Sequence, residues 1–281
     1  MRLLIFLAIL GSILFAEVGY NGKSILLTLP SPSGTISTHD LNVSVLAHPT
    51  DKNQGIAIVP IDYYAPEGDS NITWIAPGKT IALPLTVTMA SYPIETLSVD
   101  PSKVTPPPEA LDRIEREKTQ AKEIYAHFTP IRYWNKALIK PLDSNITSEY
   151  GSARTYNGTL QSYHGGVDLR ARIPIPVHAT NDGIVVLAED RYYSGGTIII
   201  DHGEGLFSCY FHLSRYDVKV GDYVHQGDSI ALTGDTGRIT GPHLHFGFMV
   251  HGVQTDPFDL LEKINALFMI QKEERVSYSI H

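Results

Sequence analysis

Two histidines one residue apart, His243 and His245, lie in a short apolar run near the C-terminal end of the chain, TGPHLHFGF at residues 240–248. In a β-strand, residues i and i+2 point to the same face, about 6.6 Å apart along the strand. Two imidazoles on one face can converge on a single metal ion or a single substrate group. An isolated pair of this kind is more often one core histidine beside one solvated histidine, because short motifs frequently match by chance. The pair therefore needs partners elsewhere in the chain.

Partners of the right chemical type occur in two other segments. YHGGVDLR holds His164 and Asp168, and its two glycines allow the backbone to fold so that imidazole and carboxylate meet at one point. CYFHLS places His212 in an expected strand. Imidazole and carboxylate are the ligands of catalytic zinc, which takes three protein ligands and keeps one open position. All five groups together would saturate the metal, so three ligands and two further histidines suit hydrolysis better.

The helix-borne zinc site of many metalloproteases is excluded, because the chain contains no HExxH motif. In such sites the glutamate of the motif handles the proton. Here a histidine would have to do so, and an imidazole with a pKa near 6.5 can accept and return a proton at neutral pH.

The segments HGGVDL, YFHLS, GDTGRITGPHLHF and GDYVHQGDSIALTG, the last expected to form a hairpin, together resemble the lysostaphin-type (LytM-like) zinc peptidases. The resemblance runs in order over residues from about 147 to 262. It implies that His164, Asp168 and His245 bind one Zn²⁺ per chain. It also implies that His212 and His243 are the catalytic pair, one activating the water and the other stabilising the oxyanion.

Two positions depart from the pattern of that family. Gly247 stands where many members carry glutamate, and Ile239 stands where serine is common. Neither position is a ligand, so the departures concern the shape of the groove. Tyr163 and Arg238 flank the site and are candidates for lining that groove. The histidines outside the matching positions are interpreted as structural or solvated: His178, His202, His225 and His251.

The rest of the chain predicts the elements that carry this site. Residues 1–16 are a short apolar run after Arg2, typical of a secretory signal, with an uncleaved anchor as the alternative. Residues 17–104 contain β-branched runs punctuated by proline and glycine, which predict a small β-sandwich. Residues 105–139 combine a proline-rich linker with an amphipathic helix of about five turns. Residues 140–265 are again β-rich and close with a helix, and residues 266–281 are expected to be a tail. The fold class is therefore mainly β, with a groove-bearing peptidase domain of antiparallel sheets.

Composition excludes several classes of protein. The formal charge is −8, and removal of residues 1–16 with their single arginine leaves 21 − 30 = −9, which argues against binding to nucleic acid or to an anionic membrane. Cys209 is the only cysteine, so the chain has no intrachain disulfide. By the two-residue period of a strand, Cys209 is expected to face away from His212.

The resemblance implies an exported, periplasmic zinc endopeptidase that cleaves peptide cross-links of peptidoglycan in cell-wall remodelling and cell shape. A D,D-endopeptidase, with D,D-carboxypeptidase activity as a possible addition, is preferred. The alternatives are an endopeptidase of glycine-rich bridges and a non-enzymatic regulator of wall amidases. The expected partners are the peptide stems and cross-links, and the oligomeric state is left open. The sandwich is expected to limit access to the groove or to position the enzyme on the wall.

Overall fold

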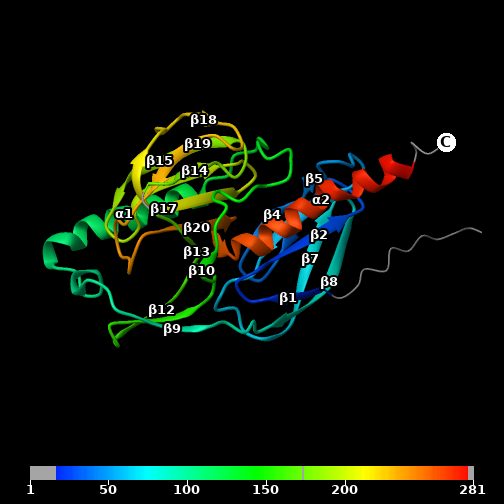
Figure 1. The fold of residues 1–281 in the computed structure, drawn as a ribbon. Coiled ribbons are helices and arrows are strands. Elements are labelled where there is room, and N and C mark those ends of the chain that lie inside the picture. Colours follow the sequence, from blue (N-terminus) through cyan, green and yellow to red (C-terminus); the bar gives the residue numbers. More distant parts are fainter. Residues whose placement is uncertain (1–16, 173, 278–281) are drawn as a thin grey trace, which may run out of the picture.

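The computed structural model describes residues 17–172 and 174–277, so the expected signal segment at 1–16 lies outside the described residues. The fold is mainly β, as the sequence predicts, and consists of a β-sandwich beside a larger sheet that carries most of the second half of the chain (Figure 1). Within the described residues, no helix combines the length and the apolar character that crossing a membrane requires.

The sandwich is built from two sheets with a shared apolar interior. One sheet has the strand order β1-β8-β7-β3-β4 and the other has the order β2-β6-β5. Trp74 and Ile36 from the first sheet and Leu29 and Val59 from the second belong to one buried cluster. The strands are β1 (Glu17–Tyr20), β2 (Ser24–Leu29), β3 (Thr35–Ser37), β4 (Asn42–Ser44), β5 (Leu46–Ala47), β6 (Gly55–Pro60), β7 (Gly68–Ala76) and β8 (Lys79–Thr88).

The apolar runs of the sequence do not indicate β7. The first four residues of this strand are polar and exposed, and only Ile72 and Trp74 reach the interior. The strand is fixed instead by long antiparallel pairing with β8. A short 3₁₀ turn (Pro101–Lys103) and α1 (Pro108–Ala126) follow the sandwich, and α1 matches the expected amphipathic helix.

Strand β9 (Ile94–Leu97) leaves the sandwich although the sequence places it there. It pairs in parallel with β11 (Ala153–Tyr156), which forms an antiparallel hairpin with β12 (Leu160–Tyr163). Alternation alone predicts that a segment is a strand, but not which sheet it joins. This small sheet lies below the large one in Figure 1 and links the two halves of the molecule.

The large sheet has the main order β10-β13-β20-β17-β16-β15-β18, with β14, β19 and β21 at its margins. We call the side that carries His243 and His245 the histidine face and the opposite side the core face. The strands are β10 (Ile146–Ser148), β13 (Val167–Arg170), β14 (Pro176–His178), β15 (Gly183–Arg191), β16 (Gly195–Asp201), β17 (Leu206–Tyr216), β18 (Tyr223–Val224), β19 (Ser229–Thr233), β20 (His243–Val250) and β21 (Val253–Thr255).

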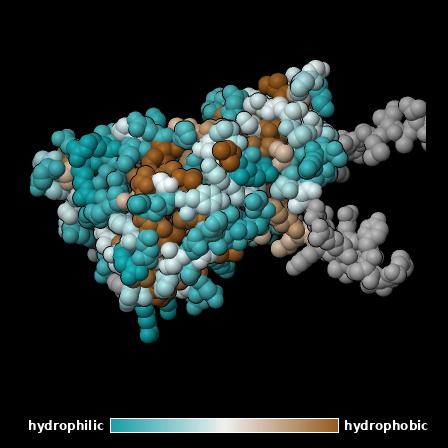
Figure 2. Space-filling model, turned by 90° about the horizontal axis from the view of Figure 1, so that it is seen from above, coloured by the Kyte–Doolittle hydropathy of each residue, from teal (hydrophilic) through white to brown (hydrophobic). Residues whose placement is uncertain are grey.

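The core face packs against helix α2 (Pro257–Ser277) and against the sandwich. Phe246 and Phe248 of β20, Leu260 and Ile264 of α2, and Ile58 of β6 belong to one buried cluster. Ser24 and Thr255 join their hydroxyls across the same junction at 3.0 Å. The two β regions therefore share a continuous core. Seen from above, hydrophilic side chains cover much of the surface and apolar ones gather in a patch near its middle (Figure 2).

Two local predictions are wrong. The segment GDYVHQGDSIALTG does not form a hairpin, because β18 pairs with β15 whereas β19 pairs with β14 and β17. The C-terminal tail expected from residue 266 is helical as far as Ser277, since α2 continues beyond the apolar segment that predicted it.

Candidate metal centre

His164, Asp168 and His245 converge on one point of the histidine face. Nε2 of His164 lies 2.9 Å from Oδ1 of Asp168 and 2.9 Å from Nδ1 of His245, and this Nδ1 lies 3.0 Å from the same carboxylate oxygen. All three side chains are buried. The three atoms form a nearly equilateral triangle of two nitrogens and one oxygen.

This triangle fits a zinc ion. Zinc–nitrogen bonds of 2.0–2.1 Å place two ligand atoms of a tetrahedron ~3.3 Å apart, slightly more than the distances found here. Two imidazoles and one carboxylate are also a donor set that catalytic zinc takes, with the fourth position left for water or substrate. We therefore name His164, Asp168 and His245 as the residues that would hold the metal.

The backbone explains how these ligands meet. Register pairs Asp168 of β13 directly with His245 of β20, which puts both on the histidine face. His164 follows β12, and the glycines after it allow close approach of the two strands. A side-chain carbon at Gly166 would lie 2.6 Å from Nε2 of His245, and one at Gly165 would lie 2.2 Å from the amide of Gln254. Any larger residue would push the ligands apart.

His212 reaches the same face through an irregularity in β17. Its φ of 65° lies in the left-handed region, and its amide donates to the carbonyl of Ser194. The bulge turns the His212 ring toward His243, with ring centroids 4.8 Å apart. Cys209, which pairs with Gly247, and Phe211, which pairs with His245, also lie on the histidine face. The prediction that Cys209 faces away from His212 is therefore wrong, because the bulge breaks the two-residue period.

Backbone carbonyls fix the tautomers of three histidines. Nδ1 of His164 donates to the carbonyl of Glu149 at 2.9 Å, that of His212 to Thr236 at 2.7 Å, and that of His243 to Gly241 at 2.7 Å. Because a carbonyl can only accept, each neutral ring carries its proton on Nδ1 and its lone pair on Nε2. Nε2 of His243 lies 3.4 Å from Oδ1 of Asp168. The Nε2 lone pairs of His164, His212 and His243 are thus available to the metal centre.

The charges of the cluster follow from its burial and contacts. Burial raises the pKa of Asp168, but the close contacts with His164 and His245 outweigh it and hold this pKa well below the usual range. Burial lowers the pKa of His212 well below 6.5, and the nearby imidazoles of His243 and His245 lower it further. Burial likewise lowers the pKa of His245 to about 4. The centre therefore presents the Asp168 carboxylate and neutral imidazoles at His212 and His245 at neutral pH, and metal ligands bind zinc in such deprotonated forms.

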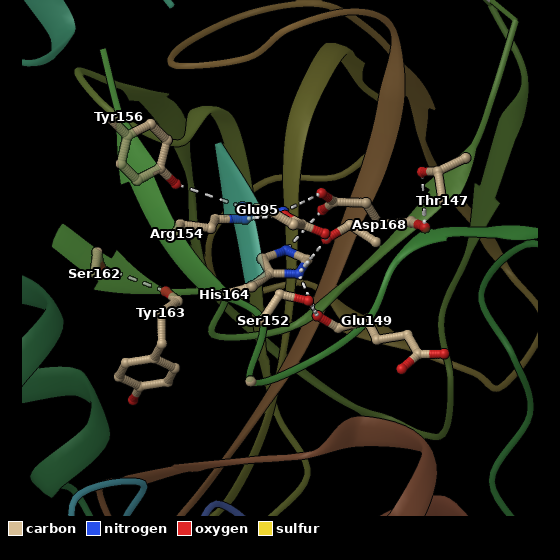
Figure 3. Close-up of polar contacts among 12 residues, drawn as sticks. Glu95, Thr147, Glu149, Ser152, Arg154, Tyr156, Ser162, Tyr163, His164 and Asp168 are labelled. Carbon is tan, nitrogen blue, oxygen red and sulfur yellow. Dashed lines mark hydrogen bonds and ion pairs between the residues drawn. The ribbon is translucent and has the colours of Figure 1, made fainter. Parts of the chain in front are cut away.

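The remaining candidates lie apart from the ligand triangle. His202 is fully buried and bonds the carbonyl of Asp182 and the hydroxyl of Ser208. Tyr163 points away from Asp168 (Figure 3) and stacks on Tyr63 of the sandwich with ring centroids 3.9 Å apart. The other histidines and Arg238 do not join the triangle: His178, His225 and His251, with Arg238 stacked over the rings of Tyr156 and Tyr193.

Three residues that sequence reasoning missed surround the ligands. Nη2 of Arg154 donates to Oδ2 of Asp168 at 2.9 Å, and Nε of Arg154 donates to Glu95 at 2.8 Å (Figure 3). Ser148 contacts Arg154, Glu95 and His164. No motif marks them, because they lie on separate strands that only pairing brings together.

One segment of the chain is similar to known proteins. Residues 162–257 match Peptidase family M23. The chain is 39% identical over 115 residues to the peptidoglycan DD-endopeptidase ShyA of Vibrio cholerae, and 38% identical over 125 residues to lysostaphin of Staphylococcus simulans. These matches cover 40% and 42% of this chain, but only 27% and 25% of the two relatives. The chain thus spans about a quarter of their length.

A solved structure matches nearly the whole chain. The crystal structure of a protein from Pseudomonas aeruginosa assigned to peptidase M23 superposes with a TM-score of 0.70 at 27% identity, over 88% of this chain and 96% of that one. The sandwich and the large sheet therefore occur together in another protein. Residues 162–257, which match the model of Peptidase family M23, also contain the three residues of the ligand triangle.

Proposed function

We propose that this chain is a zinc metalloendopeptidase that hydrolyses the peptide cross-links of peptidoglycan, and that it is a D,D-endopeptidase. The observation that carries the proposal is the convergence of two further histidines, His212 and His243, on the triangle formed by His164, Asp168 and His245. Relatives described as peptidoglycan DD-endopeptidases, ShyA, ShyB and ShyC of Vibrio cholerae at 36–39% identity, support the substrate class.

The chain's own residues divide the work of hydrolysis. Bound zinc supplies Lewis acidity for the attacking water and the scissile carbonyl. Nε2 of one outer histidine accepts the proton of the water and returns it to the leaving amine, because a neutral imidazole can do both near pH 7. The other histidine, once it carries a second proton on Nε2, donates a hydrogen bond to the oxyanion while its Nδ1–H stays on the backbone carbonyl. His243, whose Nε2 lies 3.4 Å from a ligand oxygen, is assigned to the proton transfer, and His212 to the oxyanion.

Two alternative functions remain distinct outcomes of the test. Lysostaphin matches as strongly as ShyA in identity, which keeps cleavage of glycine-rich bridges as the second candidate within the same chemistry. A non-enzymatic regulator of amidases is disfavoured because all five site residues are present and converge. Export to the periplasm is part of the proposal and depends on the segment at residues 1–16.

Muropeptide profiling tests the proposal. The zinc-loaded chain is incubated with purified sacculi cross-linked by D-Ala–diaminopimelate bonds, and in parallel with sacculi carrying pentaglycine bridges. Loss of dimeric muropeptides with gain of monomers in the first sample, suppressed by a chelator, is expected. Cleavage of the pentaglycine sample alone would establish the alternative bond, and zinc binding without hydrolysis of either sample would favour the regulator. His243→Ala provides the control for contaminating hydrolases.

A further inference from the structure

The two oxygens of Asp168 have different partners. Oδ1 faces the nitrogens of His164 and His245 at 2.9 and 3.0 Å. Oδ2 accepts from Nη2 of Arg154 at 2.9 Å. A carboxylate can bind a metal through one oxygen or two. Because the guanidinium engages Oδ2, the carboxylate presents Oδ1 alone to the site.

Arg154 is itself held in place. Its Nε donates to Oε2 of Glu95 at 2.8 Å, and its Nη2 also donates to the hydroxyl of Ser148 at 2.8 Å. The hydroxyl of Ser148 donates to Oε1 of Glu95 at 2.6 Å, so both carboxylate oxygens of Glu95 are used. The Arg154 side chain is 11% exposed and that of Glu95 is 22% exposed. In such a poorly hydrated place, the orientation of the guanidinium depends on its two carboxylate partners.

The same network touches a second ligand. The hydroxyl of Ser148 lies 3.2 Å from Nδ1 of His164. The main acceptor of this Nδ1 is the carbonyl of Glu149, the residue that follows Ser148. Ser148 therefore contacts Glu95, Arg154 and His164 at once. A substitution of Glu95 would therefore alter the contacts of two of the three ligands, Asp168 through Arg154 and His164 through Ser148.

Glu95 comes from outside the family segment at residues 162–257. It lies on β9, where parallel pairing with β11 sets Glu95 directly beside Arg154. Residues just before β9 are anchored on the sandwich, since the amide of Ala90 and the hydroxyl of Tyr92 both bond Asn21. Strand β9 thus connects the sandwich to the metal centre, and it is visible beside His164 and Arg154 in Figure 3.

We propose that Glu95 is a positioning residue of the metal centre: acting through Arg154, it orients Asp168 so that one carboxylate oxygen is presented to zinc. The inference rests on the proposed function as a zinc enzyme and on the ligand assignment made for the metal centre. It also changes the role expected for the sandwich, which completes the site through β9 in addition to any effect on access. Outer groups that orient metal ligands commonly change metal affinity 10–100-fold when they are substituted.

The competing explanation is an ion pair that only fastens β9 to β11. A fastening role lowers the melting temperature of the apo protein but leaves the zinc affinity of folded molecules unchanged. A positioning role changes zinc affinity and the geometry at the metal. The measurements are therefore zinc affinity by competition with a chromophoric chelator, the visible absorption of the cobalt-substituted protein, and apo-protein melting.

The variants are Glu95→Gln, which keeps the shape and removes the charge, and Glu95→Asp, which keeps the charge on a shorter side chain. The matched control is Glu204→Gln, which breaks a similarly buried ion pair, Arg132–Glu204, whose side chains are 16% and 12% exposed and which is not part of the site. We expect Glu95→Gln to weaken zinc binding 10–100-fold and to alter the cobalt spectrum, with Glu95→Asp between it and the wild type. Glu204→Gln should keep wild-type affinity whatever it does to melting.

Wild-type zinc affinity and an unchanged cobalt spectrum in Glu95→Gln would overturn the inference. If this variant does not fold, Glu95→Asp decides in the same way, since it retains the charge that the ion pair needs. A wild-type chain that binds no zinc would instead refute the ligand assignment, so the two failures are distinguishable.

Discussion

The histidine face of the large sheet has two halves with opposite surroundings. Over β13 and β20 it carries the ligands Asp168 and His245, and no helix is packed on them within the described residues. Over β15, β16 and β17 it carries apolar side chains that α1 covers through Ile124 and Tyr125. The first half assembles polar groups whose hydrogen bonds are specified atom by atom. The second half is an ordinary apolar contact between a helix and a sheet.

Phe211 lies at the boundary between the two halves of the histidine face and contacts both. Its ring stacks on His245 with centroids 5.0 Å apart and planes inclined by 2°, and it also packs against the cluster under α1. The covered half thus supports a ligand ring from the side, while Asp168 holds the same ring through Nδ1. The half that carries the ligands is therefore supported both from within the sheet and from its helix-covered neighbour. Substitutions should therefore have their largest effects in the open half and their smallest under α1.

The sharpest test within the open half compares its two histidines on β20. His245→Ala removes one of three protein ligands, so zinc occupancy and activity should fall together. His243→Ala leaves the ligand set whole, so zinc should stay near one per chain while turnover falls about 10²–10⁴-fold, as for loss of a general acid–base group. Metal analysis by mass spectrometry beside a turnover assay checks both. If His243→Ala lost its zinc as readily as His245→Ala, the division between ligand and catalyst would be wrong.

What the sequence predicts of this site has a physical limit. The motifs around His164, His243 and His245 could be interpreted because each places its reactive side chain by local geometry: a glycine turn or a two-residue alternation. His212 was assigned through the family resemblance, and the bulge that turns its ring was not foreseen. Glu95 and Arg154 could not be found, because they meet only through the pairing of β9 with β11, which depends on the whole fold. The prediction of the face on which Cys209 lies was wrong for a local reason. The bulge at His212 breaks the two-residue alternation, and the sequence does not show where a bulge occurs.

The fold shows the same limit on a larger scale. The two β regions and α1 were predictable from apolar periodicity, whereas β7 was not, because its first residues are polar and exposed. The division at residue 104 separates segments that share one core, since Ile58 of the sandwich packs in the same cluster as Leu260 of α2. Composition marks the elements, but the surfaces that join them carry no motif.

The core face lies behind both halves of the histidine face, so a substitution in it should destabilise both halves equally. Ile58→Ala removes a side chain that is 3% exposed at the junction with the sandwich, which should cost about 2–5 kcal/mol of unfolding free energy. Zinc content per folded molecule should be unchanged, because no ligand is touched. Denaturant unfolding followed separately by Trp74 in the sandwich and Trp134 in the catalytic core should give one coincident transition. Two separate transitions would show that the β regions are independent.

The pH dependence of stability offers a test on a buried histidine outside the site. Burial lowers the pKa of His202 from 6.5 to about 4. Between these values the unfolded chain binds the proton and the folded chain does not, so this contribution is complete above pH 6.5 and is lost as the pH falls toward 4. Its loss between pH 7 and pH 5 should be about 2 kcal/mol.

His202→Asn retains a donor for the carbonyl of Asp182 and cannot titrate. Its unfolding free energy should therefore fall less steeply between pH 7 and pH 5 than that of the wild type, and the difference between the two curves isolates His202. Zinc-free protein is used for both, so that metal release does not contribute. Parallel curves would mean that the imidazole is hydrated in the folded chain.

The smallest effect is expected under α1, at Cys209. This thiol is 3% exposed, its Sγ lies 3.3 Å from Oη of Tyr125, and burial raises its pKa to about 12. It lies on the same face as the ligands, yet the group of candidate ligands in the described part of the chain comprises His164, Asp168 and His245 without it. Cys209→Ser keeps a hydroxyl donor for Tyr125 and should cost only about 1 kcal/mol, with full zinc content and near wild-type turnover.

Cys209→Ala, which leaves Tyr125 Oη without that partner, serves as the comparison and should cost more. The measurements are denaturant unfolding, metal content and the rate at which a thiol reagent modifies the native protein, which should be slow because the neutral thiol is sealed beneath the helix. Loss of zinc in Cys209→Ser would show that the covered half takes part in metal binding, and the contrast between the two halves of the face would then be wrong.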